Sequence, residues 1–232
     1  GFSPSGNSTT PFTGSYDGNE KTISNLFIDQ GTSGIAVGLF GETQLSGVGL
    51  SDLGLLSVDI TGFTAGALVG RLSSAATAGV SGCYSTGSVT GAVVTGAVVG
   101  GLVGEAGNDT SAGTIMIENC YSRCSVNNDG SGVTAGGLVG KLNAAYTISK
   151  CYSTGNVTSS GLYKGGLVGV KPADAGTVNN AFWDKDTSEQ NSSAGGTGMI
   201  TTEMQSYATF QGAGWDFVSE TANGSADVWD MD

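Results

Sequence analysis

The sequence predicts an all-β fold, a right-handed parallel β-helix (β-solenoid) of about six coils with a C-terminal cap. Three observations predict it. The chain has 41 Gly and 3 Pro in 232 residues without a Gly-X-Y period, which excludes collagen. A Gly-Leu-hydrophobic-Gly unit recurs along it, and a Cys-Tyr-Ser unit recurs out of phase with the first. The handedness follows the general rule for parallel crossovers.

The first unit sets the length of a coil. Its closing glycines lie 29, 34, 36 and 29 residues apart. Several short strands in each interval, without a helical period, are typical of stacked β coils. We expect the Leu of each unit to fill the core while the flanking glycines let adjacent backbones approach closely. The closing glycines are Gly41, Gly70, Gly104, Gly140 and Gly169.

The second unit predicts a corner in every coil. It reads Cys83-Tyr84-Ser85, Cys120-Tyr121-Ser122 and Cys151-Tyr152-Ser153, with degenerate forms at 26–28, 53–55 and 181–183. Most residues just before it are types that tolerate a left-handed backbone, so we expect the chain to bend there. A corner also lets Ile148 and Cys151, three apart, both point inward. The residues of this column are Asn25, Asp52, Gly82, Asn119, Lys150 and Asn180.

A third column predicts how the coils stack. The residues after the Gly-Leu-x-Gly units are Glu42, Arg71, Glu105, Lys141 and Val170. Their charges alternate in sign, as expected for neighbouring positions on adjacent parallel strands. The column therefore predicts a surface ion ladder that sets the register, rather than a catalytic group.

Composition excludes several functions. The net charge is −12, from 8 Lys and Arg against 20 Asp and Glu, and there is no His. So few cations cannot form a nucleic-acid surface, and without His neither Ser-His nor Cys-His catalysis nor an imidazole metal site is available. No apolar run reaches the length of a membrane span, and Gly1 begins no signal peptide, so we expect no membrane insertion.

With these motifs the chain resembles the GLUG-motif family of extracellular proteins, named for its Gly-Leu-x-Gly unit. The resemblance covers Phe12–Gly41, the repeats in 65–169 and the closing segment Phe182–Met204. Lys150 and Cys124 depart from the family pattern, Cys124 standing in the column of Gly87 and Gly155. The resemblance implies an adhesin-like surface or secreted protein without a known active site. Because the chain begins and ends inside the pattern, we expect a piece of a longer product.

The segment 184–232 leaves the repeat. Thr202 and Gln205 have capping-box spacing, which predicts a helix with Met204, Tyr207 and Ala208 on one face. Phe210, Phe217 and all three Trp lie from 183 onward, and we expect an aromatic plug over the exposed core of the last coil. The alternative is an aromatic shelf that binds sugar.

The remaining candidate sites are weak. Cys120 and Cys124 lie too far apart on one strand for a disulfide, and we favour a buried thiol ladder of Cys83, Cys120 and Cys151 over disulfides. The Asp184-x-Asp186 pair near Glu189 is better explained by solvated turn acids than by a calcium loop. Asn-x-Ser/Thr sequons occur at Asn7, Asn108, Asn156, Asn191 and Asn223.

We therefore expect one domain, 1–232, with an N-terminal coil (1–30), repeats (31–183) and a capping segment (184–232). The predicted function is a non-catalytic extracellular structural or adhesion module at the cell surface or secreted, with no cofactor, metal or catalytic residue. Its partners would be surface glycans, host proteins or itself. The alternative is a filament subunit that assembles head to tail by strand addition at an uncovered N-terminal edge, where we find only an irregular segment, 1–10.

Two further functions rank lower. A carbohydrate-active enzyme needs converging carboxylates, and the acids of the repeats share no column. Ice binding needs an unbroken Thr array, but Arg123 interrupts the column of Thr86 and Thr154. The repeat acids are Asp59, Glu105, Asp109, Glu118, Asp129 and Asp174.

Overall fold

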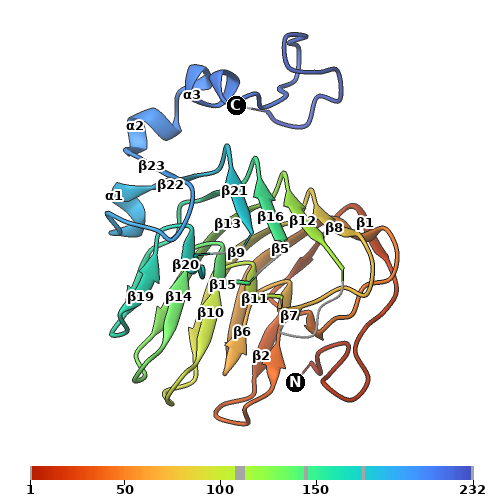
Figure 1. The fold of residues 1–232 in the computed structure, drawn as a ribbon, viewed down its shortest axis with the longest axis vertical. Coiled ribbons are helices and arrows are strands. Elements are labelled where there is room, and N and C mark those ends of the chain that lie inside the picture. The colour runs from red at the N-terminus through yellow and green to blue at the C-terminus, as the bar shows by residue number, and fades with distance from the viewer. Residues whose placement is uncertain (1, 108–112, 144–145, 174–175, 231–232) are drawn as a thin grey trace.

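Every strand pair in the described part of the chain is parallel, and all but the pair of Phe182–Asp184 with Thr197–Met199 join segments about one repeat apart. The computed structural model describes residues 2–107, 113–143, 146–173 and 176–230. It is a β-solenoid, which confirms the predicted fold (Figure 1). Two sheets of five strands each, together with the largest sheet, define five complete coils in these residues, and two further strands begin a sixth.

The strands repeat in the same order from coil to coil. The first coil has β1 (Tyr16–Ser24), β2 (Phe27–Asp29), β3 (Ala36–Val37) and β4 (Phe40–Glu42). The second has β5 (Gly49–Gly62), β6 (Thr64–Ala65) and β7 (Val69–Leu72). The third has β8 (Ala78–Ser81), β9 (Tyr84–Gly91), β10 (Val98–Gly100) and β11 (Val103–Ala106).

The later coils lead into the C-terminal segment. The fourth has β12 (Ile115–Glu118), β13 (Tyr121–Asn128), β14 (Thr134–Gly136) and β15 (Val139–Leu142). The fifth has β16 (Tyr146–Ser149), β17 (Tyr152–Ser153), β18 (Val157–Ser159), β19 (Tyr163–Gly165) and β20 (Val168–Val170). After these come β21 (Thr177–Asn179), β22 (Phe182–Asp184), α1 (Lys185–Ser188), β23 (Thr197–Met199), α2 (Thr201–Met204) and α3 (Tyr207–Gly212).

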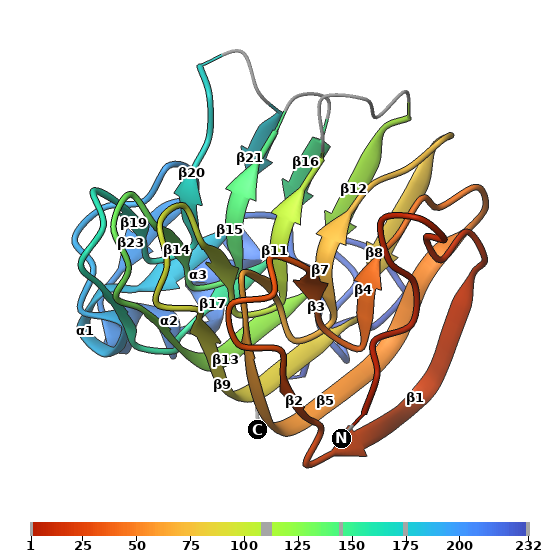
Figure 2. The same cartoon turned by 90° about the horizontal axis from the view of Figure 1, so that it is seen from below.

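Three sheets enclose the core. The largest follows the order β21-β16-β12-β8-β5-β9-β13-β17-β22-β23, with β1 and β2 against β5. The others are β19-β14-β10-β6-β3 and β20-β15-β11-β7-β4. Figure 2 shows β1, β5, β9 and β13 side by side along one face.

The predicted corners are present from the second coil onward. The backbone is left-handed at each, with φ of 53°, 61°, 54°, 49° and 49°. Ile148 and Cys151 flank one corner and are both fully buried, as expected. These corner residues are Asp52, Gly82, Asn119, Lys150 and Asn180.

The predicted register of the first coil is wrong. Asn25 has φ 58°, but Ser24 pairs with Leu56, so Asn25 lies beside Ser57 and not beside Asp52. The corner opposite Asp52 is instead an irregular stretch at 18–20. The segment 26–28 is therefore not equivalent to Cys-Tyr-Ser, since Phe27 pairs with Asp59. This coil lacks the motif, so the sequence could not reveal the irregularity.

The residues that fill the core repeat from coil to coil, as the sequence motifs do. The inward leucines Leu68, Leu102, Leu138 and Leu167 are fully buried. The glycine column is needed because the backbones meet, and a Cβ at Gly137 would collide with the carbonyl oxygen of the next coil. All four cysteines are free and buried, as in the favoured interpretation.

The thiols of Cys83, Cys120 and Cys151 are engaged with backbone. Each donates to the carbonyl two residues earlier, at 3.1–3.3 Å. Burial raises the pKa of the Cys120 thiol well above its usual value, so this thiol stays protonated. Cys124 lies opposite Gly87, as predicted from its column.

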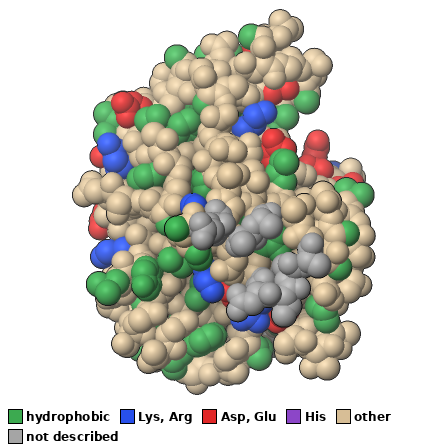
Figure 3. Space-filling model, in the orientation of Figure 1, with side chains coloured by type: hydrophobic (Ala, Val, Ile, Leu, Met, Phe, Trp, Pro, Cys, Tyr) green, Lys and Arg blue, Asp and Glu red, His purple; other side chains and the backbone are tan. Residues whose placement is uncertain are grey.

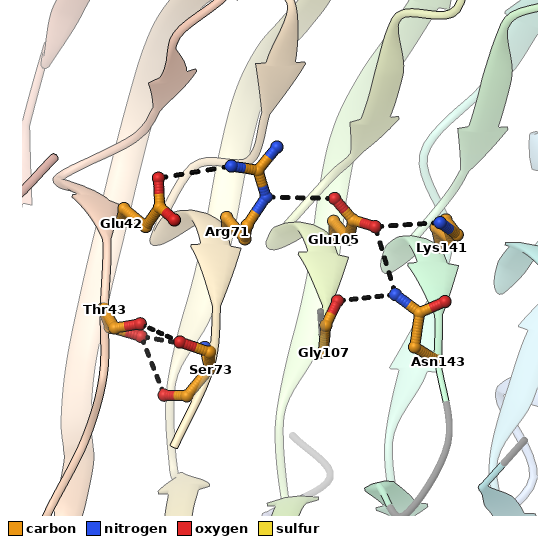
Figure 4. A network of polar contacts seen from close by, with 8 residues as sticks. All are labelled: Glu42, Thr43, Arg71, Ser73, Glu105, Gly107, Lys141 and Asn143. Carbon is orange, nitrogen blue, oxygen red and sulfur yellow. Dashed lines mark hydrogen bonds and ion pairs between the residues drawn. The ribbon is translucent and has the colours of Figure 1, made fainter. Parts of the chain in front are cut away.

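The charged column forms the predicted ion ladder (Figure 4). Arg71 contacts Glu42 at 3.2 Å and Glu105 at 3.1 Å, and Lys141 contacts Glu105 at 3.0 Å. Burial works to raise the pKa of the Glu105 carboxyl, but hydrogen bonds and charge from Lys141 and Arg71 outweigh it, and the net effect is a lowered pKa. The ladder therefore joins four consecutive coils in register.

The N-terminal end is less open than expected. Ser5 donates from its N–H to the Leu39 carbonyl at 3.0 Å, and Phe12 donates to the Glu42 carbonyl at 2.9 Å. The segment that we expected to leave the edge uncovered therefore hydrogen-bonds along β4. β1 has no outer partner strand among the described residues.

The C-terminal end is covered by Trp183, one of the predicted plug aromatics, and by a polar segment. Trp183 is buried with the main core against Gly166 of the last complete coil, and its indole N–H donates to the Gln190 carbonyl at 2.9 Å. Ser193 Oγ accepts from the N–H groups of Leu167 and Val168, at 3.3 and 2.9 Å. The Ala194 N–H donates to the Val168 carbonyl at 2.9 Å, and β23 adds to β22. These contacts satisfy backbone groups of the last complete coil.

The predicted helix at 202–208 is wrong in its details. The chain forms two short helices, and the cap at α2 is the Ile200 N–H donating to Glu203 Oε2 at 3.0 Å. Met204 is buried, but Tyr207 and Ala208 are exposed. The break after Met204 turns the second helix, so the three residues do not share a face.

Candidate functional site

A ladder of aromatic rings lies on the outer face of the largest sheet. Cys83, Cys120 and Cys151 point inward after the corner, so the residue that follows each points outward. The rings of Tyr84, Tyr121 and Tyr152 stack with centroids 4.8 Å apart at each step. Phe182 takes the next position, paired with Tyr152. We call these four residues the tyrosine ladder.

The C-terminal aromatic residues pack on this ladder. Trp215 lies 5.9 Å from Phe182 and 6.2 Å from Tyr152, between ring centroids. Trp229 lies 5.8 Å from Tyr152. The Trp215 indole N–H donates to the Asn180 carbonyl at 2.9 Å, which fixes the segment to a corner of the solenoid. The aromatic segment therefore covers a side of the coils and not the end of the core (Figure 1).

A cleft of about 810 Å³ lies between the ladder and this segment. The solenoid, the α1–α2 region and the C-terminal segment each supply part of its wall. We call it the ladder cleft. Its lining residues are Arg123, Tyr152, Thr154, Asp184, Thr187, Thr201, Met204, Gln205, Phe210, Trp215, Phe217, Trp229 and Asp230.

One carboxylate of the cleft has a structural role. Asp184 is buried, and its Oδ1 accepts from the N–H groups of Asp186 and Thr187 at 2.9 and 3.2 Å, which caps α1. Both of its oxygens also accept from the Thr201 hydroxyl, at 3.0 and 2.8 Å. Asp184 is therefore a buried helix cap and not the solvated turn acid that the sequence predicted, and its Oδ2 accepts only from the Thr201 hydroxyl.

Five other polar side chains of the cleft are unused. In the described part of the chain, their polar groups form no hydrogen bond or ion pair. The Trp229 indole N–H is also buried without an acceptor among the described residues. The cleft thus offers spare donors and acceptors beside an aromatic wall. The five side chains are Arg123, Thr154, Thr187, Gln205 and Asp230.

The cleft also affects the tyrosines. Burial, then the neighbouring Tyr121, raises the pKa of the Tyr152 hydroxyl well above its usual value, while Arg123 opposes the rise. Burial similarly raises the pKa of Tyr121. Both phenols therefore stay neutral, which leaves Arg123 and Asp230 as the charges of the cleft that have no partner in the described residues.

The acids singled out from sequence do not converge on a metal. Asp186 Oδ2 accepts from the Thr201 N–H at 2.9 Å, and Glu189 lies exposed at the end of α1. Within the described ranges, no three His, Cys, Asp or Glu side chains are grouped to hold a metal ion. Asp109 and Asp174 lie outside these ranges.

The sequons differ in accessibility. Asn7 and Asn191 are exposed. The amide of Asn223 donates to the carbonyls of Gln211 and Trp215 at 3.0 and 3.2 Å, so it is engaged in holding the C-terminal segment. Asn108 lies outside the described residues.

Sequence reasoning missed the ladder cleft. It singled out Arg123 only as an interruption of a Thr column, and Tyr152 only as part of a repeat unit. The available signal was the outward tyrosine column, because stacked rings on an outer face indicate a covering partner.

Comparisons with known proteins connect the chain to very long relatives. No protein-family model matches it. It is 33% identical over 239 residues to halomucin of Haloquadratum walsbyi, an alignment that covers 90% of this chain and 2% of halomucin. It is 36% identical over 104 residues to a protein of Evansella cellulosilytica provisionally named a Gly-rich membrane protein, covering 44% of this chain and 12% of that one.

A solved structure supports the fold. A Bacteroides ovatus protein described as a provisional immunoglobulin A1 protease superposes with a TM-score of 0.54 at 18% identity, over 84% of this chain and 71% of that one. At this identity the likeness shows a common fold and nothing about activity. Among the described residues of our chain, no helix has the length and apolar character to cross a membrane.

Proposed function

We propose that the chain is a non-catalytic extracellular module of the GLUG-motif type, a rigid structural and adhesion element displayed at the cell surface or secreted. The observation that carries the proposal is the alignment of 90% of the chain with only 2% of halomucin. A solenoid that matches so small a part of a long relative is best explained as one module among many. The relatives' names, halomucin and Gly-rich membrane protein, support a surface location.

The physical design supports a structural role. The ion ladder and the corner column tie successive coils together, and backbone hydrogen bonds continue from β4 to β20. The face drawn in Figure 3 is mostly uncharged, with few Lys, Arg, Asp or Glu side chains. A surface of this kind suits a module that remains exposed to the medium.

The structural role of Asp184 as the cap of α1 supports the proposal of a non-catalytic module. Glycoside hydrolysis needs two carboxylates beside the scissile bond, one acting as an acid and one as a base or nucleophile. Asp184 and Asp230 are the two carboxylates of the ladder cleft, and Asp184 already accepts hydrogen bonds on both oxygens. Asp230 is therefore the one carboxylate of the cleft that accepts no hydrogen bond from the described residues, and a glycoside hydrolase needs two carboxylates beside the bond.

The filament alternative has less support. Head-to-tail strand addition needs accessible strand edges at both ends of the solenoid. β23 pairs with β22, and Ser193 binds the edge of β20, so two of the C-terminal edges are occupied. Sedimentation velocity across the micromolar range distinguishes the two functions, because we expect a monomer at every concentration and a filament subunit would grow.

Antibodies raised against the purified chain test the proposal on intact cells of the source organism. Immunogold electron microscopy should label the outer surface or the secreted material without permeabilisation. Label confined to the cytoplasm would contradict the proposal.

A further inference from the structure

The walls of the ladder cleft match the two faces of a sugar ring. Pyranose rings present an apolar face of C–H groups and an edge of hydroxyls, and they bind to aromatic surfaces flanked by hydrogen-bonding groups. The half-buried rings of Tyr152 and Trp229 supply the aromatic surface in this cleft, and the fully buried Trp215 packs behind them. Its volume of about 810 Å³ lies within the range of small-ligand sites and exceeds the need of one sugar ring.

The unused polar groups match sugar hydroxyls in kind. The Arg123 guanidinium has only donors, the Asp230 carboxylate only acceptors, and the Thr154 hydroxyl offers both. A hydroxyl-rich ligand satisfies all of them at once, because each hydroxyl donates one hydrogen bond and accepts two. A hydrocarbon ligand would leave these groups unpaired on desolvation.

The charge of the cleft favours a neutral ligand. Among the lining residues, Arg123 is a cation and Asp184 and Asp230 are carboxylates, so the cleft has no excess of positive charge to attract an anionic ligand. The chain as a whole carries −12, which repels polyanions such as uronate polymers.

We propose that the ladder cleft binds a neutral oligosaccharide, with a sugar ring stacked on its aromatic wall and hydroxyls bonded to Arg123 and Asp230. This inference rests on the proposed function in one respect, that an extracellular adhesion module meets glycans. It names the ligand class and the site through which adhesion occurs.

Isothermal titration of the whole chain tests the inference. The probes are three neutral trisaccharides, maltotriose, cellotriose and chitotriose, with trigalacturonic acid as the charged comparison. We expect saturable binding of at least one neutral trisaccharide at millimolar concentration or below, and weaker binding of trigalacturonic acid. No saturable binding of any neutral probe, or tighter binding of the acid, would overturn the inference.

Two variants locate the binding. Arg123→Gln removes an exposed cation that has no ion-pair partner among the described residues, so the fold should persist, and the dissociation constant should rise about tenfold. Trp229→Ala should weaken binding at least as much. The matched control is Lys164→Gln, which removes an exposed cation on β19 and should leave binding unchanged.

Circular dichroism confirms that each variant keeps its strand content. Unchanged affinity in folded Arg123→Gln and Trp229→Ala would place the binding elsewhere and overturn the inference. Loss of binding with surface labelling intact refutes this inference alone, whereas cytoplasmic labelling with intact binding refutes the proposed function alone.

Discussion

Lys150 gives the sharpest test of the corner column. It adopts φ 49° at the corner between β16 and β17, where its neighbours in the column are Asn119 and Asn180. A left-handed backbone costs a residue with a Cβ about 1 kcal/mol, and Asn tolerates it better than Lys does. Lys150→Asn should therefore relieve part of this strain.

A hydrogen bond adds to the gain. The Asn119 side-chain oxygen is buried and has no donor among the described residues. The Asn119 N–H donates to the Ser149 carbonyl at 3.2 Å, so the two corners lie on adjacent strands. We expect the amide of Lys150→Asn to donate to that oxygen, a hydrogen bond worth about 1 kcal/mol. The total gain is about 1–2 kcal/mol, a rise of about 2–8 °C in Tm for a domain of this size.

Thermal unfolding followed by circular dichroism measures this gain. The control is Lys150→Ala, which removes the same charge but keeps a Cβ in the left-handed corner. Its Tm should stay equal to that of the unmodified chain or fall below it. If Ala raises Tm as much as Asn does, the effect comes from charge, and the argument from backbone strain is refuted.

Three further outcomes follow from the stacking. Glu105→Gln should lower the free energy of unfolding by about 1–2 kcal/mol at neutral pH. Because the folded-state pKa of Glu105 is lowered, this stability is full above the unfolded-state value of about 4.3 and is lost as pH falls through the folded-state value. Urea midpoints of variant and parent should therefore converge in acid; a constant difference would contradict the ladder. Gly137→Ala should lower the free energy of unfolding by more than about 2 kcal/mol because the added Cβ meets the Gly166 backbone. Gly212→Ala, in open space on α3, should leave it nearly unchanged. Equal melting temperatures of the two variants would argue against the close approach. The Cys120 thiol should resist iodoacetamide at pH 8 in the folded chain and react in urea; rapid labelling of the folded chain would show that the thiol column is open.

Repetition explains which features the sequence could predict. The ion ladder and the corners from Asp52 to Asn180 were predictable because each residue has an equivalent on the next coil. A single alignment of the coils brings all of these residues into columns, so each further coil adds support for that alignment. Asn25 was placed in the wrong register because its coil lacks the repeated Cys-Tyr-Ser unit, and the irregular stretch at 18–20 shifts the strand pairing.

The C-terminal segment shows where this reasoning stops. Its aromatic residues were recognised, but their place on the side of the coils depends on packing between Trp215 and the tyrosine ladder. The capping box was predicted two residues too late, at Thr202 and Gln205. In the structure the N-cap is Ile200, whose backbone N–H donates to Glu203, and an Ile at this position does not match the capping-box pattern. A repeated column, the outward tyrosines, marks only one wall of the ladder cleft, since the other walls come from the chain from β22 onward, which leaves the repeat.

A crystal structure of the chain with a bound neutral trisaccharide tests the central claim most directly. The account predicts an intact trisaccharide in the ladder cleft, with one ring against Trp229 or Tyr152 and a hydroxyl within hydrogen-bond distance of Arg123. An empty cleft with the sugar bound elsewhere would contradict the proposed site. A cleaved sugar in the cleft would contradict the non-catalytic function.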